Sequence, residues 1–502
     1  MKFEIYVEFF MLVCVVGFMA SVYPCIINGE RVQAGGLGVF EDRNPADVEE
    51  VVAVFPLLSR EDAKNAIDSA EKAFEKWAAL SPLQRGKYLV KAAQIMENEA
   101  EELARILTRE EGKTLNESRA EVARAIDIFR FYGVMGSRLR GEFTPSTDPR
   151  THLFTLREPL GVVSIITPWN FPIAIPSWKI APALICGNTV VFKPASYTPL
   201  IGYKIVEALH SAGIPPGVVN FVTGSGGEVG AELIINDKVD AISFTGSAEV
   251  GEEIKQYACR SNIRVQLELG GKNPSVVLED ADLGKAVEMV TRAAFGLTGQ
   301  ACTATSRAIV VEKIAKQFEE KLVERVKQIR VGNGLADGVE MGPVVGEKEL
   351  KKILSYVDIG LREGAKLLIG GKRLTSSEHA KGFFLEPTIF TNVTPDMKIA
   401  QEEIFGPVLS IIHVSDFDEA VEVANKIDYG LSASVFTTSL PRAFEFIHRV
   451  QAGVVKVNKP TTGLEFQVPF GGYKRSSYGD IKEQGETALD FYSKLKTVYL
   501  GY

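Results

Sequence analysis

Cys302 lies in a sequence that suits a catalytic nucleophile. It belongs to the segment GQACTA (299–304), which separates a helical run of small residues from an apolar, strand-like run. A free cysteine is usually a small buried hydrophobe, so the thiol alone predicts little. Two further polar groups end apolar runs: the carboxylate of Glu268, which precedes two glycines, and the side-chain amide of Asn170. A thiol, a carboxylate and an amide donor together are the groups that a nucleophilic mechanism needs.

The composition excludes several classes of function. The 502 residues are 46% apolar and 24% charged with a net charge of −8, which is ordinary for a globular protein. No long basic block stands out, so we expect no nucleic-acid partner. The five cysteines form no CxxC pair and the five histidines have no metal-ligand spacing, so neither a disulfide framework nor a metal site is predicted. A reducing compartment fits these cysteines best, and we expect a cytoplasmic protein.

The first 25 residues differ from the rest of the chain. Their apolar run, 9–22, is short for a membrane span. A secretory signal has a similar apolar length, but the preceding residues carry one lysine against two glutamates and lack a positive region. We interpret residues 1–25 as an apolar extension and expect no membrane association. In this interpretation the functional chain begins at Met19, and a secretory signal is the less favoured alternative.

Alternating apolar runs and helical segments predict the architecture. Ser59 and Asp62 have the spacing of a capping box, and the helical pattern that they open extends to residue 107. A first series of strand-like runs alternates with helical segments, which predicts a parallel sheet with helices on both faces. The strand-like runs are 162–166, 189–192, 218–222, 241–244 and 265–267, and the helical segments are 200–212, 227–236 and 248–260.

A second series predicts another α/β unit after Gly270 and Gly271. Its strand-like runs are 274–278, 308–311, 366–369, 408–414, 432–436 and 454–457. Two further segments, 138–156 and 488–499, alternate polar and apolar residues and resemble strands displaced from either core. Exposed strands of this kind commonly pair with another subunit.

Anion-binding signals occur in the first series. The glycine-rich turn 224–230 departs from GxGxxG by one residue and does not by itself indicate a nucleotide site. Gly246 and Ser247 follow a strand-like run and open a helix, which makes them the better phosphate candidate, with an ordinary helix cap as the alternative. Lys193 ends another run at the edge where ligands of open α/β sheets gather, although a solvated strand end explains it equally well.

The motifs, taken in order, resemble those of the aldehyde dehydrogenase superfamily from about residue 26 to the C-terminus. They are PWNFP at 168–172, KPAS at 193–196, FTGS at 244–247, ELGGK at 268–272, GQAC at 299–302, EEIFGP at 402–407 and PFGG at 469–472. The resemblance implies an α/β fold with a Rossmann-like cofactor-binding domain, an α/β catalytic domain and a small β oligomerisation region. The implied boundaries are 26–137 and 157–270 for the cofactor-binding domain, 271–470 for the catalytic domain, and 138–156 with 484–502 for the oligomerisation strands.

The same resemblance implies roles for individual residues. Cys302 adds to the aldehyde carbonyl, Asn170 and the Cys302 backbone N–H form the oxyanion hole, Glu268 activates the deacylating water, and Lys179 is a polar partner behind them. No metal is implied, and the cofactor is NADP or NAD. Lys193 and Ser196 are assigned to the adenosine ribose, Ser247 to the pyrophosphate, and Glu403 with Phe405 to the nicotinamide riboside. The other implied cofactor residues are Ile166, Thr167, Trp169 and Gly246.

These residue types are consistent with such chemistry. A free thiol has a pKa of about 8.5, so Cys302 needs local dipoles or a base to become a thiolate. Each oxyanion donor in comparable sites contributes roughly 3 kcal/mol. Glu268 can activate water if partial burial raises its pKa, and this predicts an acid product. Relatives that transfer the acyl group to coenzyme A generally lack this glutamate, so that alternative is weakened.

Two features bear on specificity. Many NAD-preferring relatives carry a glutamate where this chain has Ser196, so we expect NADP to be favoured without excluding NAD. The segments 295–307 and 457–465 resemble the 2,5-dioxopentanoate (α-ketoglutarate semialdehyde) dehydrogenases. Succinate-semialdehyde dehydrogenases tend to carry arginine where this chain has Trp178, which leaves them, with broad-specificity enzymes, as the alternative.

Several questions about the pocket and the assembly stay open at this stage. The pocket walls are expected to include Trp178, Leu297, Thr303 and Phe466. No residue is identified as the partner of a substrate carboxylate, since Arg307 is equally a structural ion-pair residue. A non-catalytic structural relative is least favoured, because all three catalytic groups are present. We expect a small-molecule aldehyde as substrate and a homodimer or homotetramer.

Overall fold

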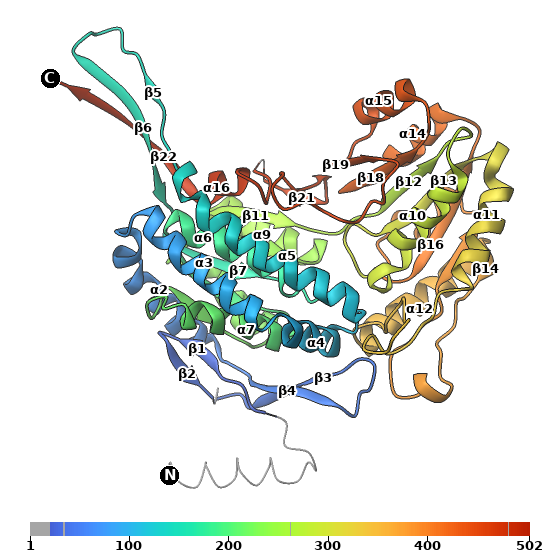
Figure 1. Ribbon diagram of the computed structural model, residues 1–502, viewed down its shortest axis with the longest axis horizontal. Helices are drawn as coiled ribbons and strands as arrows, with labels where there is room; N and C mark the ends of the chain where they lie inside the picture. Colours follow the sequence, from blue (N-terminus) through green and yellow to red (C-terminus); the bar gives the residue numbers. More distant parts are fainter. Residues whose placement is uncertain (1–20, 34–35, 262, 480) are drawn as a thin grey trace.

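Two parallel α/β sheets and a projecting three-stranded arm make up the molecule (Figure 1). The computed structural model describes residues 21–33, 36–261, 263–479 and 481–502. The apolar extension predicted for 1–25 therefore lies largely outside the described residues. The α/β class predicted from the alternating pattern is confirmed.

The first unit is built on an eight-stranded sheet of order β2-β1-β9-β8-β7-β10-β11-β21. Its five central strands are parallel. When they are numbered by their order in the chain, their order across the sheet is 3-2-1-4-5, the arrangement of a Rossmann sheet. The strands that follow β7 are added first on one side of it and then, from β10, on the other. This topological switch point lies between β7 and β10, and a crevice is expected at their carboxyl ends. The strands are β1 (Cys25–Ile27), β2 (Glu30–Val32), β7 (Val162–Ile166), β8 (Thr189–Lys193), β9 (Val219–Phe221), β10 (Val239–Thr245), β11 (Arg264–Glu268) and β21 (Ser477–Tyr478).

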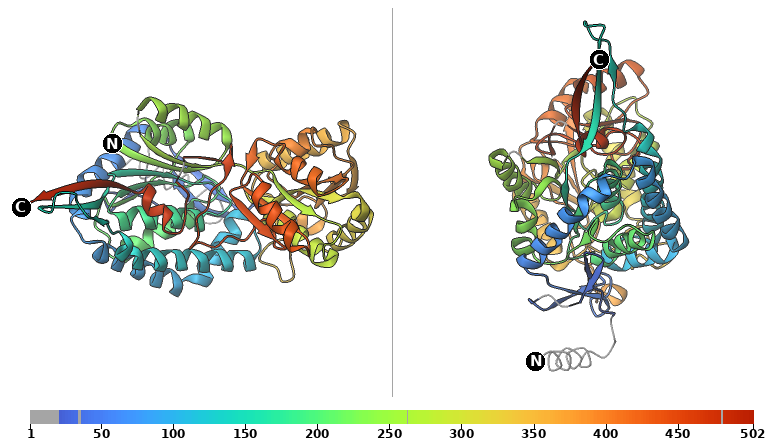
Figure 2. Two further views of the ribbon diagram at one scale, coloured as in Figure 1. Left: turned by 90° about the horizontal axis from the view of Figure 1, so that it is seen from above. Right: turned by 90° about the vertical axis from the view of Figure 1, so that its left-hand side faces the viewer.

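Helices cover both faces of this sheet, as Figure 2 shows from above. The capping box predicted at Ser59 and Asp62 is confirmed. At the start of α2, the side chain of each residue accepts a hydrogen bond from the backbone N–H of the other. Helix α6 is buried on all sides and carries Trp178 and Lys179 into the interior. The helices are α2 (Arg60–Ala78), α3 (Pro82–Asn98), α4 (Ala100–Glu111), α5 (Leu115–Val134), η1 (Met135–Arg138), α6 (Ala174–Cys186), α7 (Pro199–Ser211), η2 (Gly226–Gly230), α8 (Ala231–Ile235) and α9 (Ala248–Ser261), and a separate hairpin pairs β3 (Val39–Arg43) with β4 (Val51–Pro56).

The second unit contains a seven-stranded sheet of order β14-β15-β16-β13-β12-β18-β19, parallel except for β14. It follows the first sheet directly, because only Leu269 to Lys272 separate β11 from β12. Its strands are β12 (Asn273–Val277), β13 (Thr305–Val311), β14 (Lys366–Ile369), β15 (Thr388–Thr391), β16 (Val408–Val414), β18 (Ser432–Phe436) and β19 (Val454–Val457). Its helices are α10 (Leu283–Phe295), η3 (Gly296–Gly299), α11 (Glu312–Val326), α12 (Glu347–Arg362), η4 (Ser377–His379), α13 (Lys398–Gln401), α14 (Phe417–Asn425) and α15 (Leu440–Arg449), and β17 (Tyr429–Gly430) pairs with β20 (Tyr473–Lys474).

The arm consists of β5 (Phe143–Thr144), β6 (Thr151–Pro159) and β22 (Ser493–Gly501), and it projects beyond the first unit (Figure 1). The tail differs from the strand predicted for 488–499, because helix α16 (Thr487–Phe491) precedes β22. Ala488, Leu489 and Phe491 in this helix are buried in the core of the first unit, and this burial favours a helical turn over an extended segment. The arm itself exposes large apolar side chains, including Phe143 and Tyr499.

Among the described residues, no helix combines the length and the apolarity that a membrane crossing requires.

Candidate active site

The turn before Cys302 has an unusual backbone. Leu297 and Thr298 both have positive φ angles, 53° and 55°, in the left-handed region that side-chain-bearing residues avoid. A buried β-branched residue in this conformation is strained, and such strain persists only where surrounding contacts impose it. One contact that does so is the carboxylate of Glu117 at the start of α5, which accepts a 2.8 Å hydrogen bond from the Leu297 N–H. The position of Cys302 is therefore imposed from another part of the fold.

The two glycines after Glu268 allow close packing around Cys302. A Cβ atom on Gly271 would collide with the Cys302 carbonyl oxygen, and one on Gly270 would collide with the carboxylate of Glu403. The Gly271 N–H donates to Glu403 Oε1 at 2.8 Å, and Asn273 Nδ2 donates to the Cys302 carbonyl oxygen at 2.7 Å. The linker between the two sheets thus brings Cys302 and Glu403 close together, immediately after Glu268.

Asn170 reaches the same turn from the first unit. Its Nδ2 donates a 3.0 Å hydrogen bond to the carbonyl oxygen of Gln300, two residues before Cys302. An amide nitrogen carries two hydrogens, so a second donor remains for a reacting oxygen. Asn170 Oδ1 is buried and has no hydrogen-bond partner among the residues that the structure describes.

Glu268 has the environment of a general base with a raised pKa. Its side chain is buried, with 3% of the residue exposed, and Ser477 Oγ donates to its Oε2 at 2.6 Å. Burial and the charge of Glu483 raise the pKa of Glu268 well above its ordinary value, while the Ser477 hydrogen bond and the Lys179 charge oppose the increase. This is the direction expected of a carboxyl group that accepts a proton near neutral pH.

Lys179 forms a buried ion pair with Glu483. Its Nζ contacts Glu483 Oε1 and donates to Ser243 Oγ at 2.9 Å, while Trp178 Nε1 donates to the other carboxylate oxygen at 2.8 Å. The sequence analysis missed Glu483, because it lies outside every motif and 304 residues from Lys179. Trp178 is almost fully buried, so only part of its ring is available to a pocket.

The surroundings of Cys302 disfavour its thiolate form. Burial and the negative charges of Glu403, Glu268 and Glu483 raise its pKa above the ordinary range of a cysteine. The thiolate must therefore form during the reaction, when a nearby carboxylate accepts the proton. The group of three acids around the thiol is a source of such acceptors.

The residues predicted to hold the cofactor lie at the carboxyl edge of the first sheet. Ile166 is the last residue of β7, and Gly246 directly follows β10. The Thr167 N–H donates a hydrogen bond to the carbonyl oxygen of Lys193. The Gly246 N–H donates to the carbonyl oxygen of Glu268. The hydroxyls of Thr167 and Thr245 are buried and have no hydrogen-bond partner in the part of the chain that the structure describes. Unpartnered polar atoms at the switch point fit a bound dinucleotide.

The lysine and the two serines predicted at this edge differ in exposure. Lys193 is buried, which lowers its pKa to about 8, and its Nζ donates to the Pro194 carbonyl oxygen at 3.3 Å. Ser196 and Ser247 are exposed, and the Ser247 hydroxyl accepts a long hydrogen bond from the Val250 N–H in the first turn of α9. A lysine with a single neutral acceptor is available to a further polar ligand.

The predicted aromatic and acidic residues of the nicotinamide side also come together. Trp169 packs edge-on against Phe405 with 5.4 Å between ring centroids. Phe405 has a positive φ of 61°, and Glu403, two residues earlier, is half-buried, with desolvation raising its pKa. Within the described residues, no group of three or more His, Cys, Asp or Glu side chains has the geometry of a metal site.

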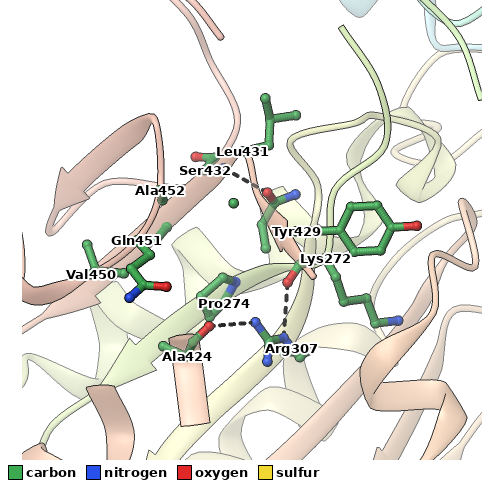
Figure 3. Close-up of a pocket in the computed structure, with 13 residues that line it drawn as sticks. Lys272, Pro274, Arg307, Ala424, Tyr429, Leu431, Ser432, Val450, Gln451 and Ala452 are labelled. Carbon is green, nitrogen blue, oxygen red and sulfur yellow. Dashed lines mark hydrogen bonds between the residues drawn. The ribbon is translucent and has the colours of Figure 1, made fainter. Parts of the chain in front are cut away.

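Arg307 is a structural residue. It is fully buried and donates to the carbonyl oxygens of Lys272 and Ala424 at 3.0 and 3.1 Å (Figure 3). It also donates to the carbonyl oxygen of Val423 at 3.1 Å. None of these partners is charged, so the ion-pair interpretation of Arg307 is wrong. Its three carbonyl acceptors and complete burial also leave it no access to a substrate carboxylate.

Comparisons with known proteins agree with this geometry. A model of the Aldehyde dehydrogenase family matches residues 32–498. The 2,5-dioxopentanoate dehydrogenase of Saccharolobus solfataricus is 51% identical over 463 residues, covering 92% of this chain and 96% of that enzyme. The alpha-ketoglutaric semialdehyde dehydrogenase of Bacillus subtilis is 47% identical over 480 residues, covering 96% and 98%. The crystal structure of betaine aldehyde dehydrogenase from Staphylococcus aureus in complex with NAD+ is 37% identical, with a TM-score of 0.93 and 95% of both chains covered.

The match spans nearly the whole chain, and the cysteine, glutamate and asparagine that suit aldehyde chemistry meet between two sheets at a Rossmann switch point. The chain belongs to the aldehyde dehydrogenase family of NAD(P)-dependent oxidoreductases, which act on small aldehydes.

Proposed function

We propose that this protein oxidises 2,5-dioxopentanoate to 2-oxoglutarate through a thioester on Cys302. The observation that carries the catalytic part is that the Cys302 turn is hydrogen bonded from both sides. Asn170 reaches it from the first unit through Gln300, and the linker that follows Glu268 reaches it from the second. Nucleophile, oxyanion donor and base are thereby held at one junction.

In the first half of the reaction, the Cys302 thiol loses its proton to a nearby carboxylate and its sulfur forms a bond with the aldehyde carbon. The carbonyl oxygen becomes an oxyanion, which the free N–H of Asn170 Nδ2 and the Cys302 backbone N–H stabilise, at roughly 3 kcal/mol per donor. A bound nicotinamide supplies the acceptor for the hydride that leaves this carbon. The carbonyl group re-forms as a thioester.

In the second half, Glu268 removes a proton from water, and the resulting hydroxide adds to the thioester carbon. The carbon–sulfur bond breaks, the carboxylic acid leaves, and the sulfur regains a proton. Glu268 is suited to this step because burial raises its pKa while Ser477 holds one of its oxygens. The net reaction consumes water and one oxidised cofactor and yields an acid.

The identity of the substrate is supported by the relatives. The two enzymes named above, at 51% and 47% identity over most of this chain, are named for 2,5-dioxopentanoate, also called α-ketoglutaric semialdehyde. NADP is the favoured cofactor in this proposal, because the exposed Ser196 lies near Lys193 where an acidic residue would repel a 2′-phosphate. A reducing, cytoplasmic location suits a catalytic thiol, and the described cysteines are all free.

The assembly is proposed to be a homodimer or a homotetramer. Members of the family are typically oligomeric. The arm exposes Phe143, Leu495, Tyr499 and Leu500, each with more than half of its surface accessible. An apolar projecting sheet of this kind is buried when a second copy covers it. The molar mass from light scattering tests the proposal, and a monomer at micromolar concentration would overturn it.

Reduced-cofactor absorbance tests the activity. The purified protein is assayed with 2,5-dioxopentanoate, succinate semialdehyde and pentanal, each with NADP and with NAD. We expect the highest kcat/KM for 2,5-dioxopentanoate with NADP. Equal values for all three aldehydes would replace the specific assignment with a broad aldehyde dehydrogenase, and a clear preference for succinate semialdehyde would replace the substrate.

A further inference from the structure

Arg124 is a partly buried cation that forms no ion pair with the described residues. It projects from the middle of α5, and its guanidinium lies 5.4 Å from the centre of the Trp178 ring. Its Nη1 donates to the Leu464 carbonyl oxygen and its Nη2 donates to Gln484 Oε1 at 3.2 Å. Its Nε is buried and has no hydrogen-bond partner among the described residues.

The other arginines of the same helix behave differently. Arg119 pairs with Glu101 and Arg130 pairs with Glu97, whereas all acceptors of Arg124 are neutral. In the part of the chain that the structure describes, no carboxylate lies within 4.0 Å of the Arg124 guanidinium; the nearest acidic influences are Glu121, which is paired with Lys113, and the exposed Glu465. Burying a guanidinium without a counter-charge is costly, so an anion that completes its hydrogen bonds is favoured.

The surroundings of Arg124 connect it to the reaction centre. The Trp178 indole donates to Glu483, whose charge acts on both Glu268 and Cys302. On the other side, the loop that contains Leu464 is tied to the second unit, because the hydroxyls of Thr461 and Thr305 share a 2.8 Å hydrogen bond. Thr305 begins β13 three residues after Cys302, so the loop that contacts Arg124 is also bonded close to the turn that carries Cys302.

A second cation adds to the positive charge of this loop. Lys456, in β19 just before the loop, donates to the carbonyl oxygens of Thr462 and Gly463. Burial and the charge of Arg124 lower its pKa to about 8, which shows that the two cations are close enough to interact. The Arg124 side chain remains partly exposed, so a small molecule can reach it.

We propose that Arg124 binds the carboxylate of the substrate and thereby selects aldehydes that carry a terminal carboxylate. The inference rests on the proposed function and names the residue that recognises the charged end. The free Nε–H and the remaining N–H groups form the fork that matches a carboxylate with two parallel hydrogen bonds. The Trp178 ring provides a flat apolar wall beside the methylene carbons of the substrate.

The test compares a charged with an uncharged aldehyde. In Arg124→Met, kcat/KM for 2,5-dioxopentanoate is expected to fall by at least about 30-fold, because a charged partner is lost from a desolvated site. The value for pentanal is expected to change by less than about 3-fold, since its transition state makes no use of the guanidinium. Arg124→Lys is expected to retain part of the preference, and Arg130→Met on the same helix is the matched control. Equal losses for both aldehydes would assign Arg124 a merely structural role and overturn the inference.

A second measurement does not depend on turnover of the semialdehyde. The probe is 2,5-dioxohexanoate, which keeps the 2-oxo carboxylate end of the substrate and has a methyl ketone in place of the aldehyde. It is expected to raise the melting temperature of the wild type and of Arg130→Met, but not that of Arg124→Met. An equal shift in all three proteins would overturn the inference. If the wild type binds the probe through Arg124 but does not oxidise 2,5-dioxopentanoate, the proposed substrate fails while the carboxylate site stands.

Discussion

Lys113 makes a buried contact with the backbone of Asn170, the proposed oxyanion donor, which leads to a prediction for Lys113→Met. The Lys113 Nζ donates to the backbone carbonyl oxygen of Asn170 and to Glu121 Oε2, both at 2.6 Å. The other oxygen of Glu121 accepts the N–H groups of Ile173 and Ala174 at the start of α6. One buried ion pair thus holds the segment that carries the Asn170 side chain at both of its ends.

These contacts determine how much stability and how much kcat Lys113→Met is expected to lose. Removing one member of a buried ion pair costs about 3–5 kcal/mol of stability, because the charge of Glu121 is left uncompensated. For catalysis, displacement of a positioned group by about 1 Å costs on the order of 100-fold in rate, and loss of an entire oxyanion donor costs about 100- to 1,000-fold. We therefore expect kcat of Lys113→Met to fall by about 100-fold while the KM for the cofactor stays nearly constant.

The assay is a double-mutant cycle on kcat with Asn170→Ala. If Lys113 acts through Asn170, the Lys113→Met substitution changes kcat by less than about 3-fold in the Asn170→Ala background. Arg85→Met is the matched control, because Arg85 is also buried and also donates to backbone carbonyl oxygens, but those belong to Ala78, Leu80 and Ile185. If Lys113→Met does not fold, Glu121→Gln takes its place in the double-mutant cycle. A loss of kcat that is the same with and without the Asn170 amide would refute the reasoning.

Four further predictions concern the reaction centre and the cofactor edge. Cys302→Ser is expected to abolish most turnover while cofactor affinity, measured by fluorescence titration, stays nearly intact; full activity would exclude Cys302 as the nucleophile. Glu268→Gln is expected to give an initial burst of reduced cofactor followed by slow turnover in stopped-flow absorbance, because thioester hydrolysis loses its base, and a steady rate equal to that of the wild type would contradict this role. Ser477→Ala removes a hydrogen bond that lowers the pKa of Glu268, so that pKa rises further and the acidic limb of the pH profile of kcat moves to higher pH; a limb that is unmoved or moves to lower pH would separate Ser477 from the base. Ser196→Glu is expected to shift the ratio of kcat/KM for NADP over NAD towards NAD by at least about 10-fold, and an unchanged ratio would show that Ser196 does not face the 2′ position.

Local sequence signals predicted much of the framework. The strand-like run at 162–166 coincides with β7, those at 241–244 and 265–267 lie within β10 and β11, and the capping box at Ser59 opens α2. These features depend on neighbouring residues, because hydrophobic period, turn chemistry and helix caps act over a few positions. The structure of the C-terminal tail was harder to predict. The residues of α16 show an alternating polar and apolar pattern, but they form a helical turn that packs against the core.

The sequence by itself determined the chemistry. The residue types define what a thiol, a carboxylate followed by two glycines and an amide can do, and the motifs that contain them resemble those of the aldehyde dehydrogenases, which implies aldehyde oxidation. The tertiary structure decided how those groups are held and tuned. The partners that do this include Glu483 for Lys179, Ser477 for Glu268, and Gln484 for Arg124, which is 360 residues away along the chain. The partner of a buried charge depends on which distant segments the fold brings together. The local periodicity of the sequence does not contain that information.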